Sequence, residues 1–138
     1  PLAAALHVAH AIDFRGPQDQ DVVARHMQRA RVFVQHSITA SDGDSEGTPI
    51  SVREAQVSGL PVVATRHTGI VDCVLEGESG FLVEEQDVES MAERMIRLAK
   101  DPGLAARLGG IGRRIALERY PLVRSLPQLG QVLRAAAS

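Results

Sequence analysis

The sequence is poor in several residue types that would mark a specialised class of protein. It holds a single cysteine, Cys73, which excludes an internal disulfide and fits a reducing compartment. Aromatic residues make up 3% of the chain and tryptophan is absent, so a base-stacking platform is not expected. The formal net charge of −2 gives no general attraction to nucleic acid. No apolar run approaches the roughly 20 residues of a membrane-spanning helix, and no signal peptide is visible.

What is present fits an ordinary globular domain. Hydrophobic residues make up 44% and charged residues 23% of the 138 residues, enough for a single core. The chain begins with Pro1 instead of Met, and its first residues, PLAAAL, resemble the middle of a helix. We therefore expect residues 1–138 to be part of a longer protein.

Expected strands alternate with expected helices along the chain. The strands are expected at residues 11–16, 31–37, 61–65 and 80–83. The helices are expected at residues 19–30, 49–58 and 87–100, and from residue 102 toward 120 with interruptions at Gly109, Gly110 and Gly112. Thr48 is suited to cap the second of these helices, with Pro49 in its first turn and Gly59 just after its end. The alternation predicts an α/β domain with a mainly parallel sheet, in which ligands bind at the carboxyl ends of the strands.

Two carboxylates, Glu46 and Glu54, lie near that edge of the expected sheet. Glu46 follows a polar run, and Glu54 lies inside the helix that begins near Pro49. Both are solvated charges, or both bind one polar ligand at two points; spacing alone favours solvated charges. Carboxylates accept hydrogen bonds from sugar hydroxyls with both oxygens, so a ligand with hydroxyls at both ends is the functional alternative.

Backbone donors lie between the two glutamates. The first turn of a helix carries free N–H groups and the positive end of the helix dipole, which favour an anion such as phosphate. The donors expected here are Gly47, Thr48, Ile50 and Ser51. A ligand with phosphates between two groups of hydroxyls would match this order of residues, and a nucleotide sugar is such a ligand.

Two histidines also follow strands at this edge. His36 and His67 either line the site or pack as surface or core residues. The histidines and acids show no spacing typical of metal ligands, so no metal site is expected.

The wider pattern of motifs resembles a known family. It includes ARVFVQHS at residues 30–37, GDSEGTP at 43–49, GLPVVAT at 59–65, GESGFLV at 77–83 and GRRIALERY at 112–120. Together they strongly resemble the C-terminal domain of the retaining group 1 (family 4) glycosyltransferases, above all bacterial polysaccharide-biosynthesis members. Those members often carry Pro-Glu where this chain has Val71 and Asp72.

The resemblance implies a fold, a reaction and residue roles. The fold implied is a Rossmann-like parallel sheet flanked by helices, as part of the C-terminal domain of a GT-B enzyme. The reaction implied is retaining transfer of a hexosyl group from a UDP- or GDP-sugar to an acceptor hydroxyl, without a metal or other cofactor. Glu46 would contact the transferred sugar, Glu54 the ribose, and the backbone at residues 47–51 the sugar and phosphates.

The resemblance also sets expectations for the rest of the protein. Residues 1–138 would be a partial nucleotide-sugar-binding domain, without the N-terminal acceptor domain and without the first strands, whose Arg and Lys would reach the diphosphate. The chain alone would then be inactive and would self-associate through open strand edges. The whole protein would act on a saccharide or lipid-linked acceptor. It would do so in the cytoplasm or at the inner face of the membrane. The alternatives are a non-catalytic nucleotide-sugar-binding or interaction module and, less favoured, another GT-B enzyme such as an epimerase.

Overall fold

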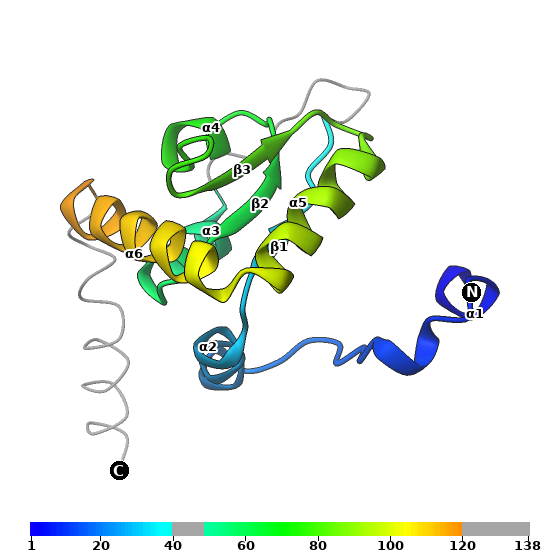
Figure 1. Cartoon of the computed structure of the whole chain (residues 1–138). Coiled ribbons are helices and arrows are strands. Elements are labelled where there is room, and N and C mark those ends of the chain that lie inside the picture. The colour runs from blue at the N-terminus through cyan, green and yellow to red at the C-terminus, as the bar shows by residue number, and fades with distance from the viewer. Residues whose placement is uncertain (40–48, 120–138) are drawn as a thin grey trace, which may run out of the picture.

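A computed structural model of the chain describes residues 1–39 and 49–119. The described part contains a small sheet surrounded by helices, with an N-terminal arm that stands away from it (Figure 1). In chain order the elements are α1 (Leu2–Ala5), the 3-10 helix η1 (Ala9–Ala11), α2 (Gln20–Arg29), β1 (Phe33–Gln35), α3 (Ile50–Val57), β2 (Val62–Thr65), α4 (Ile70–Cys73), β3 (Gly80–Val83), α5 (Val88–Lys100) and α6 (Pro102–Arg119).

The sheet is parallel and its strand order is β1-β2-β3. Phe33 of β1 pairs with Val62 of β2, and Val62 also pairs with Gly80 of β3 on its other side. All residues of β2 and β3 are buried, and the apolar, β-branched residues of β2 are typical of a strand covered on both faces. The three strands therefore end at one common edge of the sheet.

Hydrophobic cores form on both faces of the sheet because successive residues of β2 point to opposite sides. On one face, Val62 and Ala64 belong to a cluster with residues of α2, α3 and α4, including Met27, Val52 and Ile70. On the other face, Val63 and Phe81 pack with α5 and α6, through residues that include Leu98 and Leu108. The expected α/β architecture, a Rossmann-like parallel sheet flanked by helices, is confirmed.

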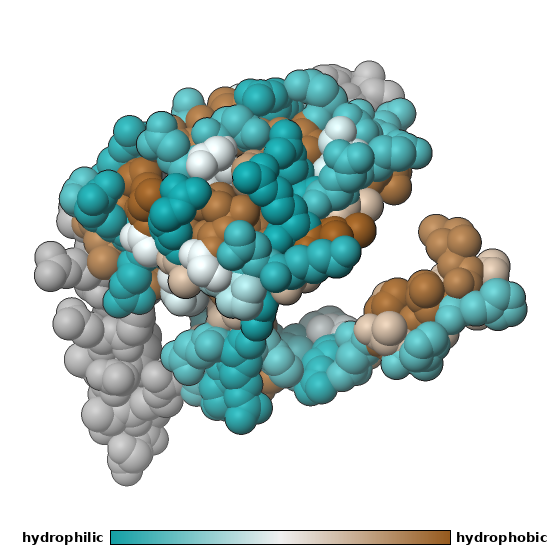
Figure 2. Space-filling view, viewed as in Figure 1, coloured by the Kyte–Doolittle hydropathy of each residue, from teal (hydrophilic) through white to brown (hydrophobic). Residues whose placement is uncertain are grey.

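The strand expected at residues 11–16 is wrong. These residues follow η1 as an extended segment outside any sheet, and Ile12 and Phe14 are 43% and 81% exposed. Figure 2 shows apolar residues along this arm. An apolar run becomes a strand only when a neighbour pairs with its backbone. No described strand pairs with residues 11–16, and β1 is an edge strand of the described sheet.

The interruptions expected in the last helix are also wrong, because α6 runs unbroken from Pro102 to Arg119. Gly109 and Gly112 are buried. A Cβ at Gly109 would lie 1.9 Å from the carbonyl oxygen of Gly59. Gly109 therefore lets α6 approach the turn that follows α3 closely.

Helix ends agree in part with the capping chemistry read from the sequence. The cap expected at Thr48 is wrong, because Pro49 takes the N-cap position of α3. Gly59 has φ of +81°, the left-handed conformation that ends many helices. The Asp87 carboxylate accepts a hydrogen bond from the Ser90 N–H at 3.0 Å and so caps α5. Within residues 1–39 and 49–119, no helix combines the length and apolarity that crossing a membrane requires.

Candidate functional site

The carboxyl edge of the sheet is held together by a threonine at the end of the central strand. The Thr65 hydroxyl donates to the Ser37 carbonyl oxygen at 2.7 Å and accepts from the Ser37 N–H at 2.9 Å. The segments that leave β1 and β2 are therefore fixed side by side. Open parallel sheets bind ligands at this edge, so a ligand site is expected here.

Helix α3 presents its N-terminus near this edge. The helix begins at Ile50, and Pro49 takes the capping position with extended backbone angles, so Pro49 precedes the first turn instead of lying in it. The Pro49 side chain makes no capping hydrogen bond, and the first N–H groups of a helix have no partners inside it. The Ser51 hydroxyl donates to Gln35 Oε1 at 3.3 Å, which joins the start of α3 to the end of β1.

Glu54 lies one turn further along α3 and is partly buried. Burial raises the pKa of its carboxyl group, and a hydrogen bond from the Gln20 side-chain amide partly offsets this rise. Gln20 donates to Oε1. Within the described part of the chain, Oε2 has no hydrogen-bond partner, so this oxygen is available to a ligand hydroxyl.

The structure brings three predicted site residues together and does not reach the other three. Ile50, Ser51 and Glu54 share the first two turns of α3. The predicted sugar contact Glu46 and the predicted backbone donors Gly47 and Thr48 lie outside the described residues.

A glutamate that the sequence analysis missed lies at the same edge. Glu85 follows β3, and its two carboxylate oxygens accept hydrogen bonds from the backbone N–H of Thr39 at 3.0 Å and from the Thr39 hydroxyl at 2.8 Å. These bonds, followed by the electrostatic influence of His67 and His36, lower the pKa of Glu85. The signal that could have indicated Glu85 was its place just after a strand of the parallel sheet.

The two predicted histidines differ in environment. His36 is exposed, whereas His67 is 4% exposed and follows the end of β2. The prediction that both follow strands at the carboxyl edge is confirmed.

Helix α4 contains Val71 and Asp72, the two residues that stand where other family members often have Pro-Glu. Val71 is 42% exposed and Asp72 is also exposed. The buried Gln56 of α3 donates from its side-chain amide to the Cys73 carbonyl oxygen at 2.8 Å. This contact ties the end of α4 to α3, so the segment with Val71 and Asp72 has a fixed helical backbone.

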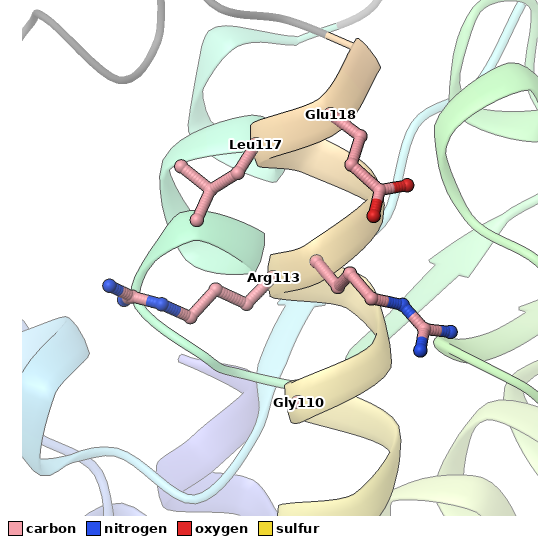
Figure 3. Close-up of a pocket in the computed structure, with 5 residues that line it drawn as sticks. Gly110, Arg113, Leu117 and Glu118 are labelled. Atoms are coloured by element: carbon pink, nitrogen blue, oxygen red, sulfur yellow. The ribbon is translucent and has the colours of Figure 1, made fainter.

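A surface pocket of about 410 Å³ lies elsewhere, along α6 (Figure 3). It is lined by Gly110, Arg113, Arg114, Leu117 and Glu118. Arg113 also donates to the Val57 carbonyl oxygen, at the end of α3 opposite Ile50. The pocket is therefore separate from the carboxyl edge of the sheet.

The sequence model described as "Glycosyl transferases group 1" matches residues 1–115 of this chain. The chain belongs to the group 1 glycosyltransferases. The match agrees with the family that the motifs indicated, and it covers the described sheet and most of α6.

The chain is similar to parts of longer enzymes. It is 38% identical over 85 residues to the amylovoran biosynthesis glycosyltransferase AmsK of Erwinia amylovora, covering 62% of this chain and 21% of AmsK. It is 36% identical over 121 residues to a GDP-mannose-dependent alpha-(1-6)-phosphatidylinositol monomannoside mannosyltransferase of Mycolicibacterium smegmatis, covering 86% of this chain and 31% of that enzyme. The chain thus spans about a fifth to a third of the length of these relatives.

A solved structure gives the same fold. Anabaena Alr3699/HepE, determined in complex with UDP-glucose, superposes with a TM-score of 0.76 over 96% of this chain and 35% of the HepE chain, at 24% identity. The likeness supports the fold of a GT-B glycosyltransferase domain.

Proposed function

We propose that this chain forms the nucleotide-sugar-binding part of a hexosyltransferase that moves a sugar from a UDP- or GDP-sugar to an acceptor hydroxyl with retention of configuration. The observation that carries this proposal is the first turn of α3, which has no side-chain cap among the described residues and lies beside the carboxyl edge of the sheet, with Glu54 one turn further along. Family membership raises this arrangement above a chance spacing of two glutamates. The whole enzyme would act in polysaccharide or glycoconjugate biosynthesis.

Each end of the donor has a proposed partner. The N–H groups of Ile50 and Ser51 would bind diphosphate oxygens, helped by the helix dipole. Glu54 Oε2 would accept from the ribose hydroxyls. Glu46 would contact the transferred sugar as the catalytic-site carboxylate, and the backbone of Gly47 and Thr48 would complete the contacts.

The reaction proposed needs no cofactor beyond the donor. The nucleotide diphosphate would leave and the acceptor hydroxyl would attack the same face of the sugar, with electrostatic stabilisation of the leaving group as the main contribution. At the described edge, the Arg66 guanidinium forms an ion pair with Glu84 at 3.2 Å, so its charge is already partly neutralised. We propose that the 138-residue chain binds donor without turnover.

The proposal includes both UDP and GDP as the nucleotide of the donor. One relative is a GDP-mannose-dependent enzyme, and HepE was determined with UDP-glucose. The acceptor proposed is a saccharide or a lipid-linked saccharide, with the enzyme in the cytoplasm or at the inner face of the membrane.

Self-association through β1 is a further part of the proposal. Among the described strands, β1 has a neighbour on one side only, so its other edge can pair with a second copy. Sedimentation velocity over a hundredfold range of concentration tests this: a concentration-dependent dimer is expected, and a monomer throughout would contradict it.

Calorimetric titration with UDP, GDP, UDP-glucose and GDP-mannose tests the donor site. One nucleotide series should bind, and Glu54→Ala should weaken both its free nucleotide and its sugar conjugate by about tenfold, the loss expected for one charged hydrogen bond. Glu46→Ala should weaken only the sugar conjugate. Glu93→Ala, an exposed change on α5, is the matched control and should change nothing.

Two results would contradict the proposal. Equal binding by wild type and Glu54→Ala would remove Glu54 from the site. Absence of binding by the wild type at millimolar ligand would leave a non-catalytic interaction module as the better account.

A further inference from the structure

His67 is a buried histidine whose ring makes no hydrogen bond within the described residues. It lies two residues after the end of β2 and is 4% exposed. Both ring nitrogens, Nδ1 and Nε2, are shielded from solvent and lack a hydrogen-bond partner. Its own carbonyl oxygen accepts from the Ile70 N–H at 3.0 Å, so the backbone at His67 is fixed against the start of α4.

An unpaired imidazole in this position is unusual. A neutral imidazole has one N–H donor and one nitrogen acceptor, and a buried polar group without a partner destabilises the folded chain. Glu85, whose pKa is lowered in part by His67, already binds Thr39 with both oxygens. The described residues at this edge therefore provide no hydrogen-bond partner for the His67 ring.

His67 and the start of α3 lie on the same face of the sheet. Ile70, three residues after His67, shares one core cluster with Val52 in the first turn of α3. The contacts between Thr65 and Ser37 hold the ends of β2 and β1 together. The segment that carries His67 therefore lies on the same side of the sheet as the first turn of α3, where an anion would bind, and an imidazole N–H can donate to such an anion.

We propose that His67 donates a hydrogen bond to a diphosphate oxygen of the donor, which makes it a further donor-binding residue. The inference rests on the proposed function, because it assigns a contact within the same site. Since both nitrogens are shielded in the free chain, donor binding must displace the groups that cover one of them. The diphosphate, and not the base or the ribose, is the part of the donor that His67 recognises.

The test compares nucleosides with nucleoside diphosphates in wild-type and variant chains of 138 residues. Uridine, UDP, guanosine and GDP are titrated into wild type, His67→Phe and His67→Gln. His67→Phe should weaken the nucleoside diphosphate that binds by about tenfold, the effect of one hydrogen bond to a charged group, and leave its nucleoside unchanged. His67→Gln, which keeps an N–H donor, should recover part of the loss.

The melting temperatures of the variants distinguish a ligand contact of His67 from a structural role. Because the ring nitrogens have no hydrogen-bond partner in the described part of the chain, His67→Phe should break no hydrogen bond there and should not lower the melting temperature. His10→Phe, on η1 in the N-terminal arm (Figure 1), is the matched control and should leave both binding and melting temperature unchanged.

The outcomes are distinct. If the wild type binds a nucleoside diphosphate and His67→Phe binds it equally well, the inference fails and the proposed function stands. A lower melting temperature, with equal losses for nucleoside and diphosphate, makes His67 structural and overturns the inference. If the wild type binds neither diphosphate, the proposed function fails first and the inference fails with it.

Discussion

Two neighbouring glycines on α6 should respond in opposite ways to the same substitution. A Cβ built on Gly109 would lie 1.9 Å from the Gly59 carbonyl oxygen and 2.8 Å from its carbonyl carbon. These are backbone atoms in the turn between α3 and β2, so they cannot rotate away as a side chain would. A Cβ built on Gly110 would meet nothing within 4 Å.

The magnitudes follow from two opposing effects. Replacing glycine by alanine in a helix interior stabilises by about 1 kcal/mol at either position. At Gly109, α6 would also have to move away from Gly59 by about 1 Å, an overpacking that costs about 1–3 kcal/mol or more. Gly110→Ala should therefore gain about 0.5–1 kcal/mol, and Gly109→Ala should lose about 1–2 kcal/mol.

Urea unfolding followed by circular dichroism measures both changes. The two variants should differ by about 1.5–3 kcal/mol in the free energy of unfolding, with Gly110→Ala above wild type and Gly109→Ala below it. If Gly109→Ala is as stable as Gly110→Ala, the close packing of α6 on Gly59 is wrong, and so is the placement of α3 that depends on it.

Three other changes test separate parts of the structure. Gly80→Ala should strongly lower the urea midpoint, because its Cβ would lie 2.2 Å from the Val62 carbonyl oxygen. Glu54→Gln should weaken nucleotide binding yet raise stability by about 0.5 kcal/mol or less at pH 7, after allowance for solvent screening. Burial raises the pKa of Glu54, so this stability difference should vanish in urea titrations as pH falls below the pKa of the unfolded chain. Asp87→Ala should lower the melting temperature at pH 7. The hydrogen bond from Ser90 lowers the pKa of Asp87, so the difference should shrink as pH falls through that lowered pKa.

Much of the fold could be predicted because local chemistry and tertiary structure agree. The apolar, β-branched residues of β2 favour a strand covered on both faces, and β2 is fully buried. Gly59 was expected just after a helix, and its φ of +81° shows why glycine is suited to that position. The caps at Asp87 and at the start of α6 likewise depend on residues close in sequence.

The wrong predictions concern features that depend on distant neighbours. Residues 11–16 have the composition of a strand, but no strand of the described sheet pairs with them. Gly109 has a low helix propensity, yet contact with Gly59, fifty residues earlier in the sequence, explains its presence inside α6.

For the candidate site, the sequence could indicate the helix that carries Glu54 but not the contacts between distant segments. The sequence indicated α3 and Glu54 through local spacing and motif, and the structure places Glu54 with Ile50 and Ser51. The contact between Glu85 and Thr39 joins two segments from the ends of β3 and β1. No spacing along the chain indicates that contact, because it exists only once the sheet has formed.

The most direct test of the donor site is a map of backbone amide shifts in ¹⁵N-labelled chain during titration with UDP-glucose and with GDP-mannose. We expect one of the two donors to shift the amides of Ile50, Ser51 and His67 with a common dissociation constant. Shifts confined to the α6 pocket around Arg113 and Arg114, or no shifts with either donor, would contradict a donor site at the carboxyl edge of the sheet.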